Sequence, residues 1–316
     1  MTSSTSSNLT LVNIGTHSLA LYTHGPEPRS YSEPVILFIS GIGCSSLNWT
    51  GVTRLLSPTL RSYTYDRSGY RNSEPSPHAP TGENIALELT HLIKNTPIPN
   101  PLIIVGHSWA GVLINEFIAI PGDVQRVAGL VLVDANHETA LQVLDPNDAS
   151  LEAISEGVDH YSAKGIAAEH KLTKEEWEAY VRDEATEKHK LQGQAEDDEY
   201  VSSFSNLLKK GLANRQPLLG DKPVYVIGGS RKRDWSGVYR AGVEKGNGTE
   251  EQRAYVRELI ATADEKSAGL MREHLKLSTK GELIFADKSG HFVQLTQPEI
   301  VADGVNWVLD ELQKSS

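Results

Sequence analysis

The sequence predicts an α/β fold in which helices flank a mostly parallel central sheet and a helical cap is inserted into the chain. Short, continuous apolar runs recur along the sequence, as expected of strands buried on both faces. Helical patterns lie between these runs, and strand–helix alternation implies parallel strands with helices on both sides of the sheet. The exception is a polar stretch from 140 to 218 that carries helical patterns and no strand signal.

The predicted strands begin with a hairpin. Residues 9–24 alternate apolar and polar side chains on either side of Gly15, which indicates two antiparallel strands at a sheet edge. The other predicted strands cover residues 34–40, 59–65, 101–105, 127–133, 223–227 and 282–286. The helices predicted between them cover residues 46–56, 81–95, 109–120 and 298–313.

The chain of 316 residues has no Pro/Gly/Ser-rich linker and no internal repeat, which favours one core with an insertion. We expect a core domain of residues 1–139 and 219–316 and a cap of residues 140–218 over the carboxyl ends of the strands. Within the cap, Thr173 and Glu176 form a capping box, which predicts a helix running to about Gln192. A second cap helix is predicted over 195–210, and a further helical stretch, 249–276, is expected beside the core.

Charge and composition exclude several classes of partner. The net charge is −11 and no basic stripe is present, so we expect no nucleic acid partner. The apolar runs fall far short of the roughly 20 residues of a membrane span. Residues 1–10 lack both the cationic patch and the apolar region of an export signal, and the single cysteine, Cys44, excludes an internal disulfide. The sequence therefore predicts a cytoplasmic protein, and it carries no signal for an oligomeric state.

The strongest chemical signal is the stretch PLIIVGHSWAG at residues 101–111. An apolar strand runs into Gly106-His107-Ser108 and then directly into a helix, which is the setting of a nucleophilic serine on a sharp turn. The helix N-terminus would supply N–H donors to a developing oxyanion. The alternative is that Ser108 merely caps the following helix.

Four motifs together resemble the α/β-hydrolase family over nearly the whole chain. They are Ser40-Gly41-Ile42-Gly43, the YDRSGY segment at 65–70, the GHSWAG segment at 106–111, and Ser289-Gly290-His291-Phe292. Two residues depart from the family pattern. Ala110 replaces the second glycine of G-x-S-x-G, and Ser40 replaces the usual histidine at the start of the oxyanion loop. The resemblance implies a structural role for Asp66 and Arg67.

The resemblance also implies a catalytic triad. His291 follows a buried strand and would serve as the general base for Ser108. Two aspartates stand where family members place the orienting acid. Asp134 follows the strand 127–133 directly, whereas Asp234 lies in SRKRDWS, where neighbouring cations offer it a solvated ion pair. We favour Asp134, with Asp234 and then Glu138 as alternatives.

The oxyanion hole would be formed by the backbone N–H groups of Ile42 and Trp109. Gly41 and His107 are expected to line the substrate pocket, and the Trp109 indole could equally line it or pack in the helix interface. Cys44 is interpreted as a packing residue. No phosphate-binding glycine loop and no metal-ligand spacing are present, so no cofactor and no metal are implied.

The function that follows is a serine carboxylic-ester hydrolase, cleaving an ester or lactone of a small, fairly apolar molecule through an acyl-enzyme on Ser108. A lyase or isomerase that uses the same residues for acid–base chemistry is the main alternative. Perhydrolysis as a side activity and a ligand receptor that retains the triad are further alternatives, because a fold does not determine a function.

Overall fold

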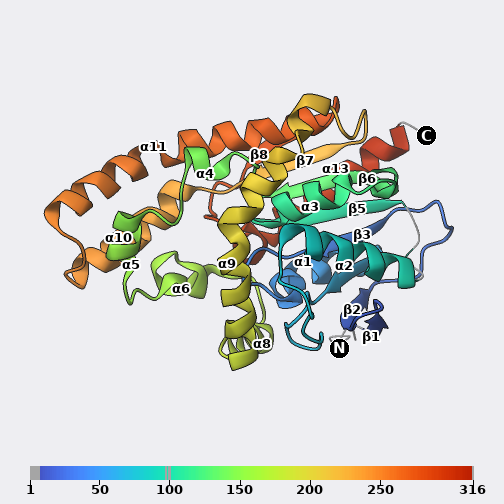
Figure 1. The fold of residues 1–316 in the computed structure, drawn as a ribbon, viewed down its shortest axis with the longest axis horizontal. Helices are drawn as coiled ribbons and strands as arrows, with labels where there is room; N and C mark the ends of the chain where they lie inside the picture. Colours follow the sequence, from blue (N-terminus) through green and yellow to red (C-terminus); the bar gives the residue numbers. More distant parts are fainter. Residues whose placement is uncertain (1–7, 97, 99–100, 315–316) are drawn as a thin grey trace.

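A single eight-stranded sheet forms the centre of the computed structural model, which describes residues 8–96, 98 and 101–314 (Figure 1). The strands lie in the order β1-β2-β4-β3-β5-β6-β7-β8. Their bounds are Asn8–Asn13 (β1), Ser18–His24 (β2), Val35–Ile39 (β3), Ser62–Tyr65 (β4), Leu102–His107 (β5), Val127–Val133 (β6), Val224–Gly228 (β7) and Gly281–Phe285 (β8). Only β2 pairs antiparallel, with β1 and with β4, and all other pairs are parallel. The predicted fold class and the edge hairpin are confirmed.

Two apolar layers cover the sheet, because successive strand side chains point to opposite faces. On one face, Leu37, Ile104 and Leu132 pack with helices α2 (Gly82–Asn95) and α3 (Ala110–Ala119). On the other face, Phe38, Val105 and Val133 pack with α1 (Thr50–Leu56) and α13 (Pro298–Lys314). The central strands are therefore buried on both sides, which explains their continuous apolar runs. The strand predicted over 282–286 differs: it is β8, at the edge of the sheet, and its residues are exposed or half-buried.

The register of the parallel strands brings the ends of β3, β5, β6 and β7 to one edge of the sheet. Ile39 of β3 pairs with Gly106 of β5, and His107 of β5 pairs with Val133 of β6. Val133 in turn pairs with Ile227 of β7. The residues that follow these strands, Ser108 and Asp134 among them, are consequently neighbours although the sequence separates them.

The segment 140–218 contains no strand and lies over this edge, and it is built from helices. They are α4 (Ala140–Val143), α5 (Ala149–Ser155), α6 (His160–Ala163), α7 (Ile166–Glu169), α8 (Lys174–Glu184) and α9 (Glu187–Lys209), followed by a 3₁₀ turn at Leu212–Arg215. The capping box of Thr173 and Glu176 is present at the start of α8. The helix predicted to reach Gln192 instead ends at Glu184, because Thr186 caps a new helix by accepting the N–H of His189. The second cap helix, predicted over 195–210, is α9, and because of this cap it starts earlier, at Glu187, and crosses the end of the sheet (Figure 1).

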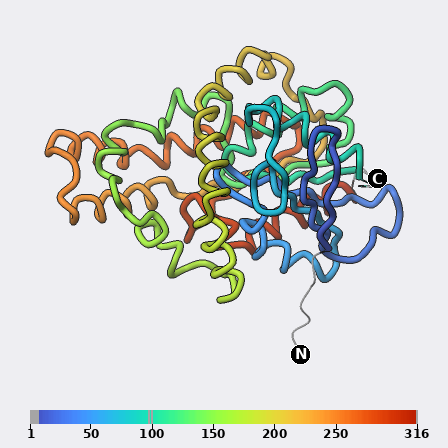
Figure 2. Tube along the Cα trace, turned by 60° about the horizontal axis from the view of Figure 1, so that its bottom comes forward, coloured from blue at the N-terminus to red at the C-terminus, as the bar shows by residue number. Residues whose placement is uncertain are grey.

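Helices α10 (Arg231–Glu244) and α11 (Glu250–His274) extend away from the sheet on the same side as α5 and α6 (Figures 1 and 2). Two glycines of α10 allow a close approach: a Cβ at Gly237 would lie 2.0 Å from the carbonyl oxygen of Ala163, and one at Gly242 would lie 2.0 Å from that of Ile154. The wall beside the sheet is therefore shared by the inserted segment and by α10 and α11, which lie outside residues 140–218. The stretch 249–276 is predicted to pack beside the core. In the structure, the C-terminal part of α11 does so, at Leu270 and Met271.

The remaining helical segments are short. They are the 3₁₀ turns Ser46–Trp49, Asp123–Arg126 and Leu275–Leu277 and the helix α12 (Val293–Thr296).

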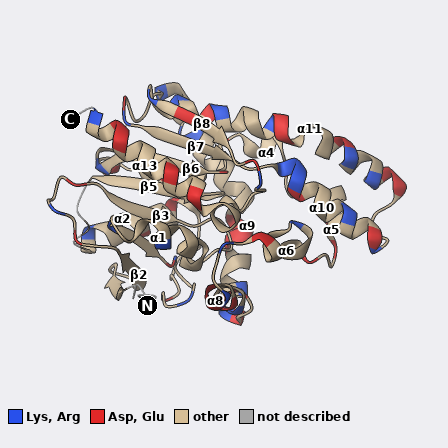
Figure 3. Cartoon of the chain, turned by 180° about the vertical axis from the view of Figure 1, so that it is seen from behind, with Lys and Arg blue, Asp and Glu red and all other residues tan. Residues whose placement is uncertain are grey.

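No helix in the described part of the chain is both long enough and apolar enough to cross a bilayer. Of the segment 1–10, in which no export signal is expected, residues 1–7 lie outside the described residues. Acidic and basic residues are interspersed along α11 (Figure 3).

We expect the substitution Gly237→Ala to lower the free energy of unfolding by about 1–3 kcal/mol, because the added methyl group meets a backbone carbonyl that cannot move independently. The matched control is Gly269→Ala on the exposed face of α11, where a Cβ would meet nothing within 4 Å. That control should raise the free energy of unfolding by about 0.5–1 kcal/mol. Urea unfolding of both variants measures the difference, and equal effects would contradict the close packing of α10 on the inserted segment.

Candidate active site

Ser108 occupies the sharp turn between β5 and α3. Its φ of +57° lies in the left-handed region, which costs a non-glycine residue about 1–3 kcal/mol. The surrounding backbone holds this conformation: the Ser108 N–H donates to the Val133 carbonyl (3.2 Å), and the Ser108 carbonyl accepts from the N–H groups of Gly111 (3.0 Å) and Asn136 (2.7 Å). Ala110 lies in α3 with ordinary helical backbone, so alanine in place of the second motif glycine needs no unusual φ.

Asp134 and His291 meet beside this turn. The distance from Asp134 Oδ2 to His291 Nδ1 is 2.5 Å, and Asp134 is fully buried. Asp134 also has a positive φ, +40°, and its backbone N–H donates to the Ile227 carbonyl at 2.7 Å. The other carboxylate oxygen, Oδ1, accepts the N–H of Gly229 at 3.0 Å. The strand ends of β6 and β7 thus fix this carboxylate in place.

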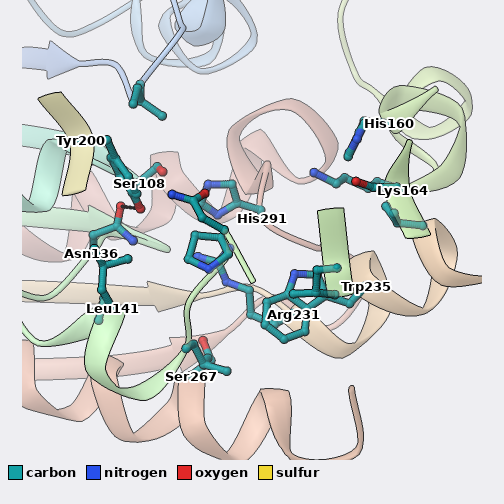
Figure 4. A pocket seen from close by; sticks show the side chains of 18 of the residues that line it. Ser108, Asn136, Leu141, His160, Lys164, Tyr200, Arg231, Trp235, Ser267 and His291 are labelled. Atoms are coloured by element: carbon teal, nitrogen blue, oxygen red, sulfur yellow. Dashed lines mark hydrogen bonds between the residues drawn. The ribbon is translucent and has the colours of Figure 1, made fainter. Parts of the chain in front are cut away.

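Hydrogen bonding determines how the imidazole of His291 is protonated. A carboxylate only accepts, so Nδ1 of His291 carries the proton and donates to Asp134, and Nε2 is left as the acceptor. Ser108 and His291 both line one cavity and lie next to each other in its wall (Figure 4). Nε2 of His291 is therefore available to a group bound at Ser108.

Burial and nearby charged groups determine the pKa values of Asp134 and His291. Burial alone would raise the pKa of Asp134, but the Arg231 guanidinium, 3.3 Å away, and the hydrogen bond from His291 lower it to about 2. Burial lowers the pKa of His291 below its usual value, and Arg231 lowers it further, although Asp134 opposes both effects. The pair therefore holds a carboxylate and a neutral imidazole at neutral pH.

Asp234 does not lie in a solvated loop, contrary to the sequence-based expectation. It is buried in the first turn of α10, and its Oδ2 accepts the backbone N–H of His291 at 2.8 Å. A Cβ at Gly290 would lie 1.7 Å from Asp234 Oδ1, so only glycine fits at that position. The expected ion pair of Asp234 with its neighbouring cations is wrong, since Arg231 pairs with Asp134 and Arg233 with Glu169. Asp234 holds the main chain of His291, whereas Asp134 contacts its ring.

Glu138, the remaining candidate acid, lies elsewhere. It lines a separate cavity with residues that include Thr139 and Leu212, and burial raises its pKa. The geometry brings Asp134 alone, among the three candidate acids, to the imidazole of His291.

The backbone N–H groups of Ile42 and Trp109 flank Ser108. Trp109 follows the serine directly, and Ile42 lies in a turn closed by the N–H of Cys44 and the carbonyl of Gly41 (3.3 Å). Within the described ranges, neither N–H donates a hydrogen bond to the protein. In the described part of the chain, both N–H groups are thus without a protein acceptor.

A buried ion pair attaches the turn at 40–44 to the inserted segment. Arg67 donates from Nη1 to the Ser40 carbonyl (2.6 Å) and from Nη2 to the Gly41 carbonyl (2.8 Å). The same guanidinium donates to both carboxylate oxygens of Glu196 in α9, at 2.7 and 2.8 Å. Glu196 also accepts the N–H of Gly43 at 3.1 Å. The structural role expected of Arg67 therefore extends to holding the loop that carries Ile42.

The cavity has a volume of about 290 Å³ and lies between the sheet edge, the inserted segment and α10–α11 (Figure 4). Its apolar wall comes from both helical regions, with Leu141, Leu144, Ile154, Val256, Leu270 and Met271. Its polar lining includes Asn136, His160, Lys164, Tyr200, Arg231 and His291. No sequence motif marked Lys164 or Arg231, since both belong to polar helical segments whose position depends on the tertiary fold.

Gly41 and His107, expected in the pocket lining, do not line this cavity. Gly41 packs against the turn that carries Ser108, where a Cβ would lie 2.9 Å from Cβ of Ser108. His107 is buried, and its Nε2 lies 3.0 Å from the carbonyl oxygen of His291. Burial lowers the pKa of His107 well below its usual value, so it is a neutral group that packs against the site.

Two other side chains of the motifs are also packed away from the cavity. Trp109 is fully buried, and its indole N–H donates to Ser203 Oγ of α9 at 2.9 Å, which favours packing over a pocket wall. Cys44 is buried, and burial raises its pKa. In the part of the chain that is described, no three His, Cys, Asp or Glu side chains are grouped so that they could hold a metal ion.

Comparison with protein-family models identifies the class of this protein. Residues 36–304 match the model described as "Alpha/beta hydrolase family". That range spans most of the chain and all four sequence motifs, so the protein belongs to the alpha/beta hydrolase family.

Individual proteins to which this chain is similar carry different names. A protein named "AB hydrolase superfamily protein" from Gibberella zeae is 29% identical over 92% of this chain and 91% of its own length. A "Probable transporter efuK" from Hormonema carpetanum is 32% identical over 96% of this chain, which spans only 43% of that relative's length. A solved structure of a putative epoxide hydrolase from Pseudomonas aeruginosa has a TM-score of 0.66 at 13% identity, with 98% of this chain and 97% of that chain covered. Such names do not indicate one substrate.

We expect Glu196→Gln to lower the free energy of unfolding by about 3–5 kcal/mol, because the change leaves the buried Arg67 without a counter-ion. Asp198→Asn, on the exposed side of the same helix, is the matched control and should change it by less than about 0.5 kcal/mol. Urea unfolding followed by circular dichroism measures both. Equal stability of the two variants would contradict the attachment of the loop to α9 through this ion pair.

Proposed function

We propose that this protein is a serine carboxylic-ester hydrolase that cleaves an ester or lactone of a small molecule. The proposal is supported above all by one observation: the imidazole that is hydrogen-bonded to Asp134 lines the same cavity as Ser108. Nucleophile, base and orienting carboxylate are the parts that acyl transfer needs. The family, whose name is that of hydrolases, agrees with this class of reaction.

In the first step, Ser108 Oγ attacks the carbonyl carbon of the substrate, and His291 Nε2 takes the hydroxyl proton. The imidazolium is stabilised by the carboxylate of Asp134, which stays ionised because of its low pKa. The N–H groups of Ile42 and Trp109 donate to the oxyanion of the tetrahedral intermediate. The C–O bond to the leaving group then breaks, and His291 returns the proton to the departing alcohol.

In the second step, water attacks the carbonyl carbon of the acyl-enzyme while His291 accepts one of its protons. The ester bond to Ser108 breaks, the serine recovers its proton from His291, and the carboxylic acid leaves. A cavity of about 290 Å³ with an extensive apolar wall suits a small molecule better than a polymer.

Replacement of each candidate acid tests this assignment of roles. Asp134→Asn should lower kcat/KM by about 10²- to 10⁴-fold, because an amide cannot stabilise the imidazolium. Asp234→Asn is the matched control: its side-chain oxygen can still accept the His291 N–H, so the loss should stay within about tenfold. Ser108→Ala and His291→Ala should each cost about 10³-fold or more. A larger loss in Asp234→Asn than in Asp134→Asn would contradict the choice of acid.

Turnover in water enriched in oxygen-18 separates hydrolysis from a lyase or isomerase reaction at the same residues. Hydrolysis places one oxygen atom from water in the acid product, whereas the other reactions incorporate none. We expect an acid product with one heavy oxygen by mass spectrometry. Conversion of the substrate without labelled product would overturn the proposal.

The pH dependence of kcat/KM tests the effect of the Arg231 charge on the pKa of His291. Activity is lost as the pH falls through the pKa of His291, which burial and then Arg231 hold below 6.5. Arg231→Met removes a cation that disfavours the imidazolium, so the pKa of His291 should rise and the acidic limb of kcat/KM should move to higher pH. Lys232→Met, at an exposed position in the same helical turn, is the control and should leave the limb in place. A limb that moves to lower pH in Arg231→Met would contradict this account.

A further inference from the structure

Lys164 is a cation that the proposed mechanism does not use. It follows the short helix α6 and donates its backbone N–H to the His160 carbonyl at 3.0 Å. Its side chain lines the same cavity as Ser108 and His291. Figure 4 shows the amine end of Lys164 directed into the cavity, on the side where His291 lies.

The amine of Lys164 forms no ion pair with any described residue of the protein. Among the residues that the structure describes, no carboxylate lies within 4.0 Å of it and no hydrogen bond from it is formed. The two buried aspartates of the site are engaged elsewhere, Asp134 by His291 and Arg231, and Asp234 by the backbone N–H of His291. Burial lowers the pKa of Lys164, Asp234 raises it, and Arg231 lowers it.

The other acids of the cavity do not neutralise this cation. Glu152 and Asp197 also line the cavity, but both are exposed residues and are solvated. The groups that interact electrostatically with Lys164 inside the site are His160, His291, Asp234 and Arg231. A partly buried ammonium beside a second cation and without its own partner is costly unless an anion binds there.

The rest of the cavity suits an apolar chain. Leucine, isoleucine, valine and methionine side chains of α4, α5 and α11 line the same cavity as the cation. A ligand that matches both parts has an apolar body and one anionic group.

We propose that Lys164 forms a carboxylate-binding subsite, so that the ester or lactone attacked by Ser108 carries a free carboxylate on an apolar chain. The inference rests on the proposed function and adds the substrate class to it. The ammonium donates to the carboxylate of the substrate and fixes the distance between that group and the scissile carbonyl. Lysine acts here as a point charge on a flexible stem, so an arginine at this position retains the interaction in part.

Paired substrates test the subsite. The 4-nitrophenyl monoesters of succinic, glutaric, adipic and suberic acid are each compared with the methyl ester of the same compound, which lacks only the free carboxylate. For at least one chain length, the wild-type protein should show a kcat/KM at least about tenfold higher for the free acid. Lys164→Met should lower this ratio about tenfold or more, and Lys164→Arg should retain part of it.

Lys171→Met is the matched control, since Lys171 is an exposed lysine of the same inserted segment and does not line the cavity. Its ratio should equal that of the wild type. A ratio that is unchanged in Lys164→Met, or a wild type that prefers the neutral ester at every chain length, would overturn the subsite.

A binding measurement separates the subsite from the catalytic proposal. Monomethyl adipate is titrated calorimetrically into Ser108→Ala and into Ser108→Ala combined with Lys164→Met, and we expect about tenfold weaker binding to the second protein. Equal binding would overturn the subsite even if the wild type hydrolyses esters. Weaker binding to the double variant supports the subsite even if ester hydrolysis fails, in which case only the catalytic proposal falls.

Discussion

The 2.5 Å hydrogen bond between Asp134 and His291 is the interaction around which the site is organised. It exists because the parallel register of β5, β6 and β7 ends these strands at one edge, so that the turn after β6 places a carboxylate beside the turn that carries Ser108. Both turns place a non-glycine residue at positive φ, Ser108 at +57° and Asp134 at +40°. The backbone bonds of the sheet edge maintain these conformations, and the apolar layers on both faces keep the sheet edge rigid.

The two buried aspartates have separate tasks around one histidine. Asp134 determines the tautomer of the ring, while Asp234 holds the main chain on which the ring is carried. Arg231 compensates the buried charge of Asp134. On the other side of Ser108, the pair of Arg67 and Glu196 fixes the loop of Ile42 to α9. The inserted segment therefore contributes both to the cavity wall and to the position of the loop beside Ser108.

The sheet, its flanking helices and the position of Ser108 depend on local sequence and are therefore predictable from it. Apolar periodicity identified the sheet and its flanking helices, and the strand–turn–helix pattern singled out Ser108. The choice between Asp134 and Asp234 was not decidable from sequence, because both follow strands that end at the same edge. Their difference lies in side-chain direction, which depends on φ at Asp134 and on the first turn of α10. Lys164 had no signal at all, since a lysine in a polar helical segment is usually solvated.

A helix boundary is predicted wrongly where two capping residues lie close together in the sequence. The capping box at Thr173 predicts one helix to about Gln192, but Thr186 caps a second helix and so divides the segment in two. The proposed chemistry requires an activated Ser108, and labelling with a fluorophosphonate probe followed by peptide mass analysis tests this most directly. We predict a single labelled peptide that carries the phosphonate on Ser108, with labelling much slower in His291→Ala. Folded wild-type protein that stays unlabelled at Ser108 would contradict the account.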